Sequence, residues 1–153
     1  MFGELGKSQF ACYCSQIVGD GTSELYKAFT NNLSEFYYSM GSPANIIIYS
    51  ARPLILDSIT LRNCPKAIWT GPTNGIIYGS NNNKNWTQLT TFTSPSLKES
   101  YQYNVTVNAD VEFNYFKIQL NGSYTNVLGG KDVIIGKIRL NAKERIETWQ
   151  KIQ

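Results

Sequence analysis

An all-β sandwich is the fold class that the sequence predicts, and three observations lead to it. Apolar and polar residues alternate along several short segments, which is the period of a strand with one buried face. Turn-forming Gly, Pro and Asn residues separate these segments. Only 16% of the 153 residues are charged, so Asn, Ser, Thr, Gln and Tyr dominate the polar surface, as suits sheets and loops better than helices.

The alternation is clearest in four segments, in which every second residue is apolar: 59–62, 103–107, 116–120 and 134–140. Further strands are expected, with a less regular period, at 9–18, 44–50, 66–70, 75–79 and 86–92. Many short strands with regular turns predict a sandwich or a barrel.

Helix is expected in only two places. Residues 23–29 could form one or two turns. In the tail, Ile146, Trp149 and Ile152 are spaced three apart among helix-forming residues, which gives one apolar stripe. We therefore expect one β-sandwich domain over residues 1–142, followed at 143–153 by a tail that is either helical or a frayed connector.

The composition argues against catalysis and against nucleic-acid binding. The chain contains no His, so a Ser-His-Asp triad is impossible and the commonest metal ligand is missing. It has no P-loop, HExxH or paired CxxC motif, and no pattern singles out two carboxylates for glycoside hydrolysis. The net charge is +3, and the Lys and Arg residues are scattered rather than interleaved with aromatic residues. We predict a protein that is not an enzyme and does not bind nucleic acid.

The three cysteines, Cys12, Cys14 and Cys64, cannot form a closed disulfide framework. We expect small, buried, reduced thiols, which fit synthesis in a reducing compartment. The N-terminal segment lacks the continuous apolar stretch of a signal peptide, and no apolar run is long enough to span a membrane.

Several segments, taken in chain order, resemble one known family. Residues 58–63 and 77–89 are similar to the "LRN" strand end and the "GSNDG-x-W-T-x-L" motif of the discoidin, or coagulation factor 5/8 type C, family. Residues 26–32 resemble its "YKAFDGN" loop, 114–120 its "YRYIRI" strand, and 135–140 its closing "IGLSEIRL" strand. The resemblance implies a galactose-binding-like jelly roll of about eight strands, with ligand-binding loops at one end.

Two departures from the family pattern concern calcium. Thr30 stands where the family's calcium-type loop usually carries Asp, and Lys137 stands where the last strand carries Glu. Calcium prefers several oxygen ligands and carboxylate charge, so the pattern argues against a calcium site. Asn31, Asn32 and backbone carbonyls could still hold a weakly bound ion, but we expect no metal and no cofactor.

The candidate ligand-binding residues each have a structural alternative. In the family, the region around Tyr37 and Tyr38 projects a ligand-contacting spike, but both rings could equally pack in the core. Trp69 precedes an amide-rich loop and could bind ligand there, or it could cap the core. Arg52 could bind sugar hydroxyls or remain solvated. Trp86 is expected to anchor its hairpin to the core. The full candidate set is Asn31, Asn32, Tyr37, Tyr38, Arg52, Trp69 and Asn74.

The match also resembles domains of bacteriophage tail fibres and other virion appendages. The resemblance implies a binding module that recognises host cell-surface carbohydrate and is displayed as a homo-oligomer, with a trimer as in phage fibres. Its location would be the virion, after synthesis in the bacterial cytoplasm. The main alternative is a structural virion adaptor that binds another virion protein. Two others are an accessory carbohydrate-binding domain of a larger enzyme and membrane binding by apolar spikes, for which Phe36–Tyr38 is less apolar than expected.

Overall fold

The structure is a computed structural model that describes residues 10–14, 25–39, 41–66, 71–122 and 124–143. Its elements are, in chain order, β1 (Phe10–Cys14), the 3-10 helix η1 (Leu25–Phe29), β2 (Tyr37–Ser39), β3 (Ala44–Leu54), β4 (Leu56–Arg62), β5 (Asn74–Ser80), β6 (Thr87–Thr93), β7 (Gln102–Thr106), β8 (Phe113–Asn121), β9 (Tyr124–Thr125), β10 (Lys131–Ile135) and β11 (Lys137–Ala142). Within these ranges, no helix has the length and apolar character that a membrane crossing requires.

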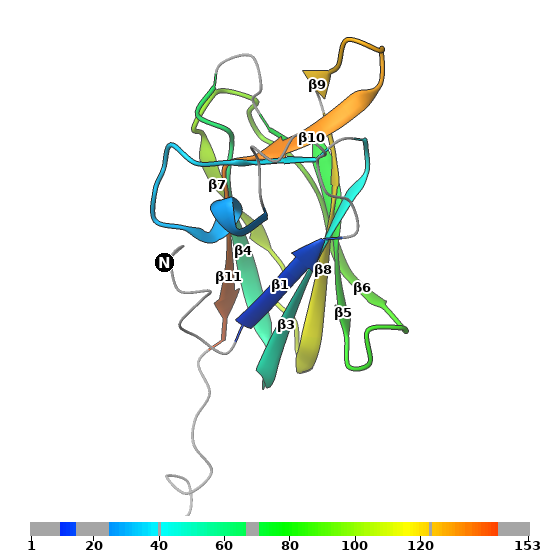
Figure 1. Ribbon diagram of the computed structural model, residues 1–153. Helices are drawn as coiled ribbons and strands as arrows, with labels where there is room; N and C mark the ends of the chain where they lie inside the picture. The colour runs from blue at the N-terminus through cyan, green and yellow to red at the C-terminus, as the bar shows by residue number, and fades with distance from the viewer. Residues whose placement is uncertain (1–9, 15–24, 40, 67–70, 123, 144–153) are drawn as a thin grey trace, which may run out of the picture.

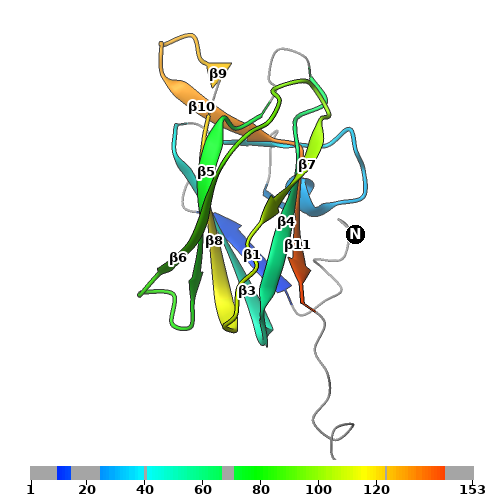
Figure 2. The same cartoon turned by 180° about the vertical axis from the view of Figure 1, so that it is seen from behind.

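Two antiparallel sheets face each other across one core (Figures 1 and 2). One has the strand order β1-β3-β8-β5-β6 and the other β11-β4-β7, while a small third sheet, β2-β10-β9, lies across one end. The third sheet, the loops 41–43, 71–73, 94–101 and 126–130, and the adjoining strand ends at Asn74 and Asn121–Gly122 form what we call the loop end. The β5–β6 hairpin, residues 81–86, lies at the opposite end (Figure 1). The all-β jelly-roll prediction is confirmed.

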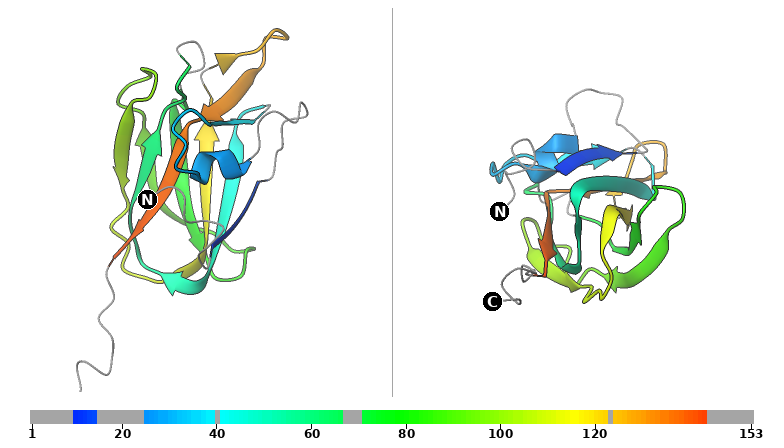
Figure 3. Two further views of the ribbon diagram at one scale, coloured as in Figure 1. Left: turned by 60° about the vertical axis from the view of Figure 1, so that its left-hand side comes forward. Right: turned by 90° about the horizontal axis from the view of Figure 1, so that it is seen from below.

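The core follows directly from the alternation seen in the sequence. In β8, Phe116, Ile118 and Leu120 are fully buried, and β3 pairs with this strand so that Ile46 lies opposite Ile118. Ile59 of β4 packs into the same cluster from the facing sheet. Burying each such side chain stabilises the fold by roughly 1.5–3 kcal/mol. The view along the strands shows the two layers around this core (Figure 3).

One predicted strand is in fact two. The segment 134–140 was expected to be continuous, but β10 ends at Ile135 and β11 begins at Lys137. The break lies at Gly136, whose N–H donates to the Arg62 carbonyl at 2.8 Å and whose Cα lies so close to the backbone of Asn63 that a Cβ would overlap it. The chain therefore changes sheets at Gly136, which lets β10 form the third sheet at the loop end.

The other expected segments have different outcomes. Leu25–Phe29 confirms a short helical segment within residues 23–29, although it is a 3-10 helix. In the segment expected to be a strand at 66–70, Lys66 lies in a bend, and the remaining positions lie outside the described residues. The tail beyond Lys143 also lies outside them, so the division at 142/143 stays a prediction.

Trp86 does not anchor its hairpin to the core as expected. Its ring lies 4.7 Å from Nζ of Lys117, and Tyr78 lies against the same ammonium at 4.5 Å. Lys117 points to the outer face of the five-stranded sheet, because its neighbours Phe116 and Ile118 point inward. Trp86 thus holds the hairpin on the outer face, through a cation–π contact.

Cys64 has the environment expected of a buried thiol. It is free and fully buried. Burial raises the pKa of its thiol to about 11, because the apolar surroundings disfavour the thiolate. The side chains of Cys12 and Cys14 lie outside the described part of the structure.

Candidate functional site

A cluster of amide groups links β5 and β8 at the loop end. The Asn121 side-chain N–H donates to Oδ1 of Asn74 at 2.5 Å, and the Asn74 amide donates to Oγ1 of Thr73 at 3.2 Å. Thr73 in turn donates its backbone N–H to the carbonyl of Asn121 at 2.8 Å. Each amide is therefore held in one orientation, and Oδ1 of Asn121 accepts no hydrogen bond from the described residues.

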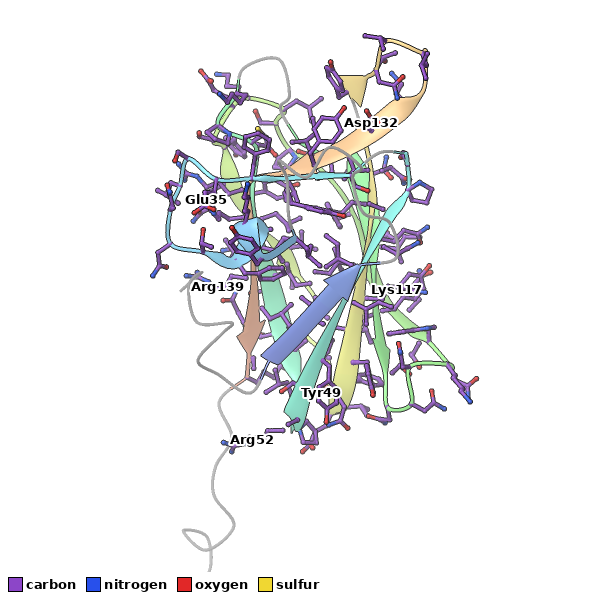
Figure 4. The ribbon with its side chains drawn as sticks, viewed as in Figure 1. Glu35, Tyr49, Arg52, Lys117, Asp132 and Arg139 are labelled. Atoms are coloured by element: carbon purple, nitrogen blue, oxygen red, sulfur yellow. The ribbon has the colours of Figure 1, made fainter. Side chains whose placement is uncertain are left out.

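A buried carboxylate organises the third sheet beside this cluster. Asp132, the second residue of β10, is only 1% exposed. One carboxylate oxygen accepts a short hydrogen bond from the Tyr38 hydroxyl. The other accepts from the Gly41 N–H at 2.9 Å and from the Asn126 amide at 3.1 Å. Asp132 thus fixes β2, the loop after it, and the β9–β10 hairpin. Figure 4 marks its place near the third sheet.

The ionised form of Asp132 is the favoured one. Burial alone would raise the pKa of this carboxyl, but hydrogen bonds from Gly41, Tyr38 and Asn126 to the carboxylate outweigh burial and hold the pKa below its ordinary value of 3.8. Asp132 is thus a stable anion whose oxygens are already in use, and its role is to position the segments around it.

Gly122 joins the amide cluster to the carboxylate. Its N–H donates to Oγ of Ser42 at 2.9 Å, and its Cα lies so close to the Asp132 carbonyl that a Cβ would overlap it. Tyr124 follows on β9 and pairs with Asp132. Its ring makes an edge contact with Tyr38, with centroids 6.2 Å apart at 71°. The half-buried Tyr124 thus follows the amide cluster closely in the chain and packs against Tyr38.

Asn63 holds a second loop at this end. Its side chain is fully buried and donates to the carbonyls of Ser96 and Lys98, both at 2.9 Å. Its backbone N–H donates to the carbonyl of Tyr101, also at 2.9 Å. The β6–β7 loop is thereby fixed, and it presents Tyr101, a residue that is 40% exposed.

The loop after η1 surrounds a lysine ammonium. Nζ of Lys137 donates to the Lys27 carbonyl at 2.5 Å and to Oγ1 of Thr30 at 2.9 Å. Thr30 also donates to Glu35 at 3.3 Å, so a carboxylate completes the surroundings. The resemblance placed Thr30 and Lys137 at a calcium site, and these residues do meet. They do not fit calcium, because a fully buried ammonium lies among the oxygens that would bind it.

The structure brings together only some of the predicted ligand residues. Tyr38 and Asn74 lie at the loop end. Tyr37 is fully buried in the core cluster, so of the two roles left open for it the structure supports packing. Arg52 lies at the opposite end of the sandwich, away from the loop end (Figure 4).

Asn31 and Asn32 are exposed on the loop that follows η1. Oδ1 of Asn32 accepts from the N–H and the hydroxyl of Ser34, at 3.1 and 2.6 Å, which shapes this loop. Trp69 lies outside the described residues, so its role stays a prediction.

Sequence reasoning missed several residues of the loop end. They are Thr73, Tyr101, Asn121, Tyr124, Asn126 and Asp132. Asn121 precedes a glycine, and that pattern predicts a turn rather than a ligand-binding residue. Asp132 is a lone acid before an apolar strand, and nothing in that pattern shows that three donors surround it. Among the described residues, no group of three or more Cys, Asp or Glu side chains could hold a metal ion.

No family model and no curated protein matches the chain, whereas solved structures do. A family 32 carbohydrate-binding module of Clostridium perfringens, solved with GalNAc-beta-1,3-galactose, matches with a TM-score of 0.71 at 10% identity, covering 88% of this chain and 96% of that one. Another, from NanJ of the same organism and solved with galactose, has a TM-score of 0.67 at 14% identity, covering 86% and 93%. An F5/8 type C domain of Bacteroides fragilis has a TM-score of 0.71 at 12% identity, covering 89% and 93%. The chain has the discoidin-like, galactose-binding-like jelly-roll fold.

Proposed function

We propose that this chain is a non-catalytic carbohydrate-binding module and that it binds sugar at the loop end. The observation that carries the proposal is the fixed amide cluster of Thr73, Asn74 and Asn121, close in the chain to the half-exposed ring of Tyr124. A sugar presents hydroxyls that both donate and accept hydrogen bonds, and an apolar C–H face. Amides supply both kinds of hydrogen-bonding group, and an aromatic ring accepts the C–H face.

The cluster is arranged before a ligand arrives. The two Asn amides hold each other, and Gly122 and Asp132 fix the backbone beside them. A site that is already ordered loses less conformational entropy on binding. Because a single shallow contact with a sugar is weak, useful affinity would come from several copies displayed together.

Galactose and N-acetylgalactosamine are the first sugars to test. The solved modules with the same fold carry galactose and GalNAc-beta-1,3-galactose in their structures. The shared fold alone does not transfer a ligand, so the panel must be broad and must include bacterial surface polysaccharides.

Hydrolysis of the bound sugar is not part of this proposal. Glycoside hydrolysis needs two carboxyl groups placed across the bond that breaks. At the loop end, the buried Asp132 already accepts from Tyr38, Gly41 and Asn126, which leaves it unsuited to exchanging protons with a substrate.

A glycan array with the purified full chain, followed by calorimetric titration of the best ligand, tests the proposal. Asn74→Ala and Asn121→Ala should each weaken binding about tenfold or more, the effect of losing one well-placed hydrogen bond. Trp69→Ala tests the position that lies outside the described residues. Asn85→Ala is the matched control, because Asn85 is an exposed amide in the hairpin at the opposite end.

Thermal unfolding of each variant shows that a loss of binding is not a loss of folding. Saturable binding that the loop-end variants lose and Asn85→Ala keeps would support a sugar site at the loop end. Absence of binding by the folded chain across the panel, or equal losses in the Asn85→Ala control, would contradict it.

One observation favours a second candidate, a structural adaptor that binds another protein. Val127 and Leu128 at the tip of the β9–β10 hairpin are 99% and 90% exposed. Oδ1 of Asn126 accepts from the N–H groups of Leu128 and Gly130, at 2.9 and 3.1 Å, so the tip has a defined shape. Two adjacent aliphatic side chains on an ordered projection suit a shallow apolar recess on a partner protein. If Val127→Ser/Leu128→Ser abolishes assembly with that partner and leaves any glycan binding intact, the adaptor role is favoured.

The setting that we propose is a bacteriophage virion appendage, with host cell-surface carbohydrate as the ligand and a homo-oligomer, a trimer as in phage fibres, as the displayed form. The proposal rests on the resemblance to tail-fibre domains and on the need for avidity. Light scattering of the purified chain tests the oligomer, and antibody labelling of purified particles tests the location. A monomer, or particles without the label, would remove the respective part of this proposal.

A further inference from the structure

We propose that the ammonium of Lys137 is a built-in cation, which holds the loop after η1 in the way a bound divalent ion would and makes the fold independent of calcium. The inference concerns the stability of this loop and does not rest on the proposed glycan binding. The inference rests on the two hydrogen bonds that the Lys137 ammonium donates.

Lys137 is tied to the loop at two points. It is the first residue of β11, is fully buried, and reaches across to η1 and the loop after it. There the ammonium donates to the Lys27 carbonyl at 2.5 Å and to the Thr30 hydroxyl at 2.9 Å. One ammonium thus joins residues about 110 positions away in the chain, and two of its three protons have oxygen acceptors.

The charges around the ammonium also fit a cation site. Burial is the largest influence on Lys137 and lowers the pKa of its ammonium, while the negative charge of Glu35 opposes this shift. Thr30 donates to the Glu35 carboxylate at 3.3 Å. Arg62, opposite Lys137 on β4, acts against the charged form. A carbonyl, a hydroxyl and a carboxylate are the kinds of oxygen that also bind calcium, so the surroundings suit a cation.

Lys137 and a calcium ion exclude each other. A second cation among the same oxygens would be repelled by the ammonium at short range in a partly buried setting, where screening by water is weak. The loop that carries Asn31 and Asn32 therefore keeps its shape without metal. Any ligand binding that depends on this loop is then insensitive to chelators, a consequence that does rest on the proposed function.

Hydrogen exchange of the full chain tests the proposal. With the wild type, exchange of the backbone amides of residues 25–35 should be the same in millimolar calcium chloride and in EDTA. In Lys137→Met, which removes the ammonium and keeps most of the length of the side chain, exchange there should be about tenfold faster or more, because both hydrogen bonds of the ammonium are lost. Lys131→Met, in an exposed lysine of the neighbouring strand, is the matched control and should leave this segment unchanged.

A second variant separates a cation role from simple space filling. Lys137→Glu places a carboxylate beside Glu35, so the loop should exchange fast in EDTA, and calcium should slow it. If the Lys137 side chain only filled space, calcium would not change the hydrogen exchange of any variant. Slower exchange of the wild type in calcium, unchanged exchange in Lys137→Met, or no calcium response in Lys137→Glu would each overturn the proposal.

Discussion

Two buried charges organise neighbouring parts of this molecule, and the protein compensates them differently. Asp132 on β10 and Lys137 on β11 are five residues apart, and both are almost completely buried. Asp132 accepts from a hydroxyl, a backbone amide and a side-chain amide. Lys137 donates to one carbonyl and one hydroxyl. The chain thus uses an anion to hold the hairpin and a cation to hold the loop after η1.

The directions of the two pKa shifts indicate how well each charge is compensated. Three donors to Asp132 outweigh burial and lower the pKa of its carboxyl, so ionised Asp132 stabilises the fold above pH 3.8, and this contribution is lost as the pH falls through its lower folded pKa. Burial is the largest influence on Lys137 and lowers the pKa of its ammonium to about 8, despite the charge of Glu35. The anion is therefore well compensated, whereas the cation retains a cost of burial.

Removing the anion should have the largest effect on stability. Asp132→Ala leaves the donors of Tyr38, Gly41 and Asn126 without their common acceptor, so we expect a loss of about 3–5 kcal/mol in the free energy of unfolding, measured in urea. The exposed Asp110 provides the control, and Asp110→Ala should cost less than about 0.5 kcal/mol. Equal effects of the two substitutions would show that Asp132 does not organise the loop end.

Titration of the cation should give the next largest effect. Between pH about 8 and 10.5, the unfolded chain binds a proton on Lys137 that the folded chain has released, so folding becomes more favourable as the pH rises. The gain is about 3 kcal/mol at most. Glu35 and Arg62 face the ammonium, with opposite influences on its charge.

Comparison of the wild type with Lys137→Met isolates this gain. The comparison is needed because the Cys64 thiol has the opposite effect: its folded pKa of about 11 exceeds the ordinary 9.0, which lowers stability as the pH rises through that range. The free energy of unfolding of the wild type minus that of the variant should rise between pH 8 and 10.5. If this difference did not change with pH, the pKa of Lys137 would be the same in the folded and the unfolded chain, which would contradict the prediction.

Substitution of Gly122, which lies between the amide cluster and Asp132, should cause an intermediate loss of stability. In Gly122→Ala, the new Cβ would overlap the Asp132 carbonyl, so the backbone of β10 or of the β8–β9 turn must move. We expect a loss of about 1–3 kcal/mol. Gly129→Ala separates the effect of a steric overlap from that of backbone conformation. An added Cβ would meet no atom there, but the residue has a φ of +88°. Gly129→Ala should be strained by its backbone alone.

The smallest effect is expected at the tip of the hairpin that Asp132 holds. Val127→Ser/Leu128→Ser changes side chains that are 99% and 90% exposed, so the free energy of unfolding should change by less than about 0.5 kcal/mol. A clear fall in the thermal unfolding midpoint of the double variant would show that the two residues are covered in solution, for example by a second copy of the chain.

Local patterns in the sequence were sufficient for most of the fold. The period of two in 116–120 and 103–107 gave the correct faces of β8 and β7, because one face of each strand packs on the core. The break at Gly136 could not be predicted, since it depends on the close approach of the Arg62–Asn63 backbone. The short strands β2 and β9 are held by Asp132 rather than by their own pattern.

The candidate site was harder to predict from the sequence than the fold. Tyr38 was predicted from the family's ligand-contacting spike and Asn74 from the amide-rich loop after Trp69. The partners that fix them, Asp132 and Asn121, lie 94 and 47 residues further along the chain. Arg52 has the right chemistry but lies at the opposite end (Figure 4). Conversely, the departures at Thr30 and Lys137 were visible, because the resemblance aligned both positions with one site.

The most direct test of the account is a chemical-shift titration of the labelled full chain with galactose and with the best glycan from the array. We predict saturable shifts in the backbone amides of Thr73, Asn74, Asn121 and Tyr124, with the Asn81–Asn85 amides at the opposite end unchanged. Shifts concentrated in Asn81–Asn85, or none with any glycan at saturating concentration, would contradict a sugar site at the loop end.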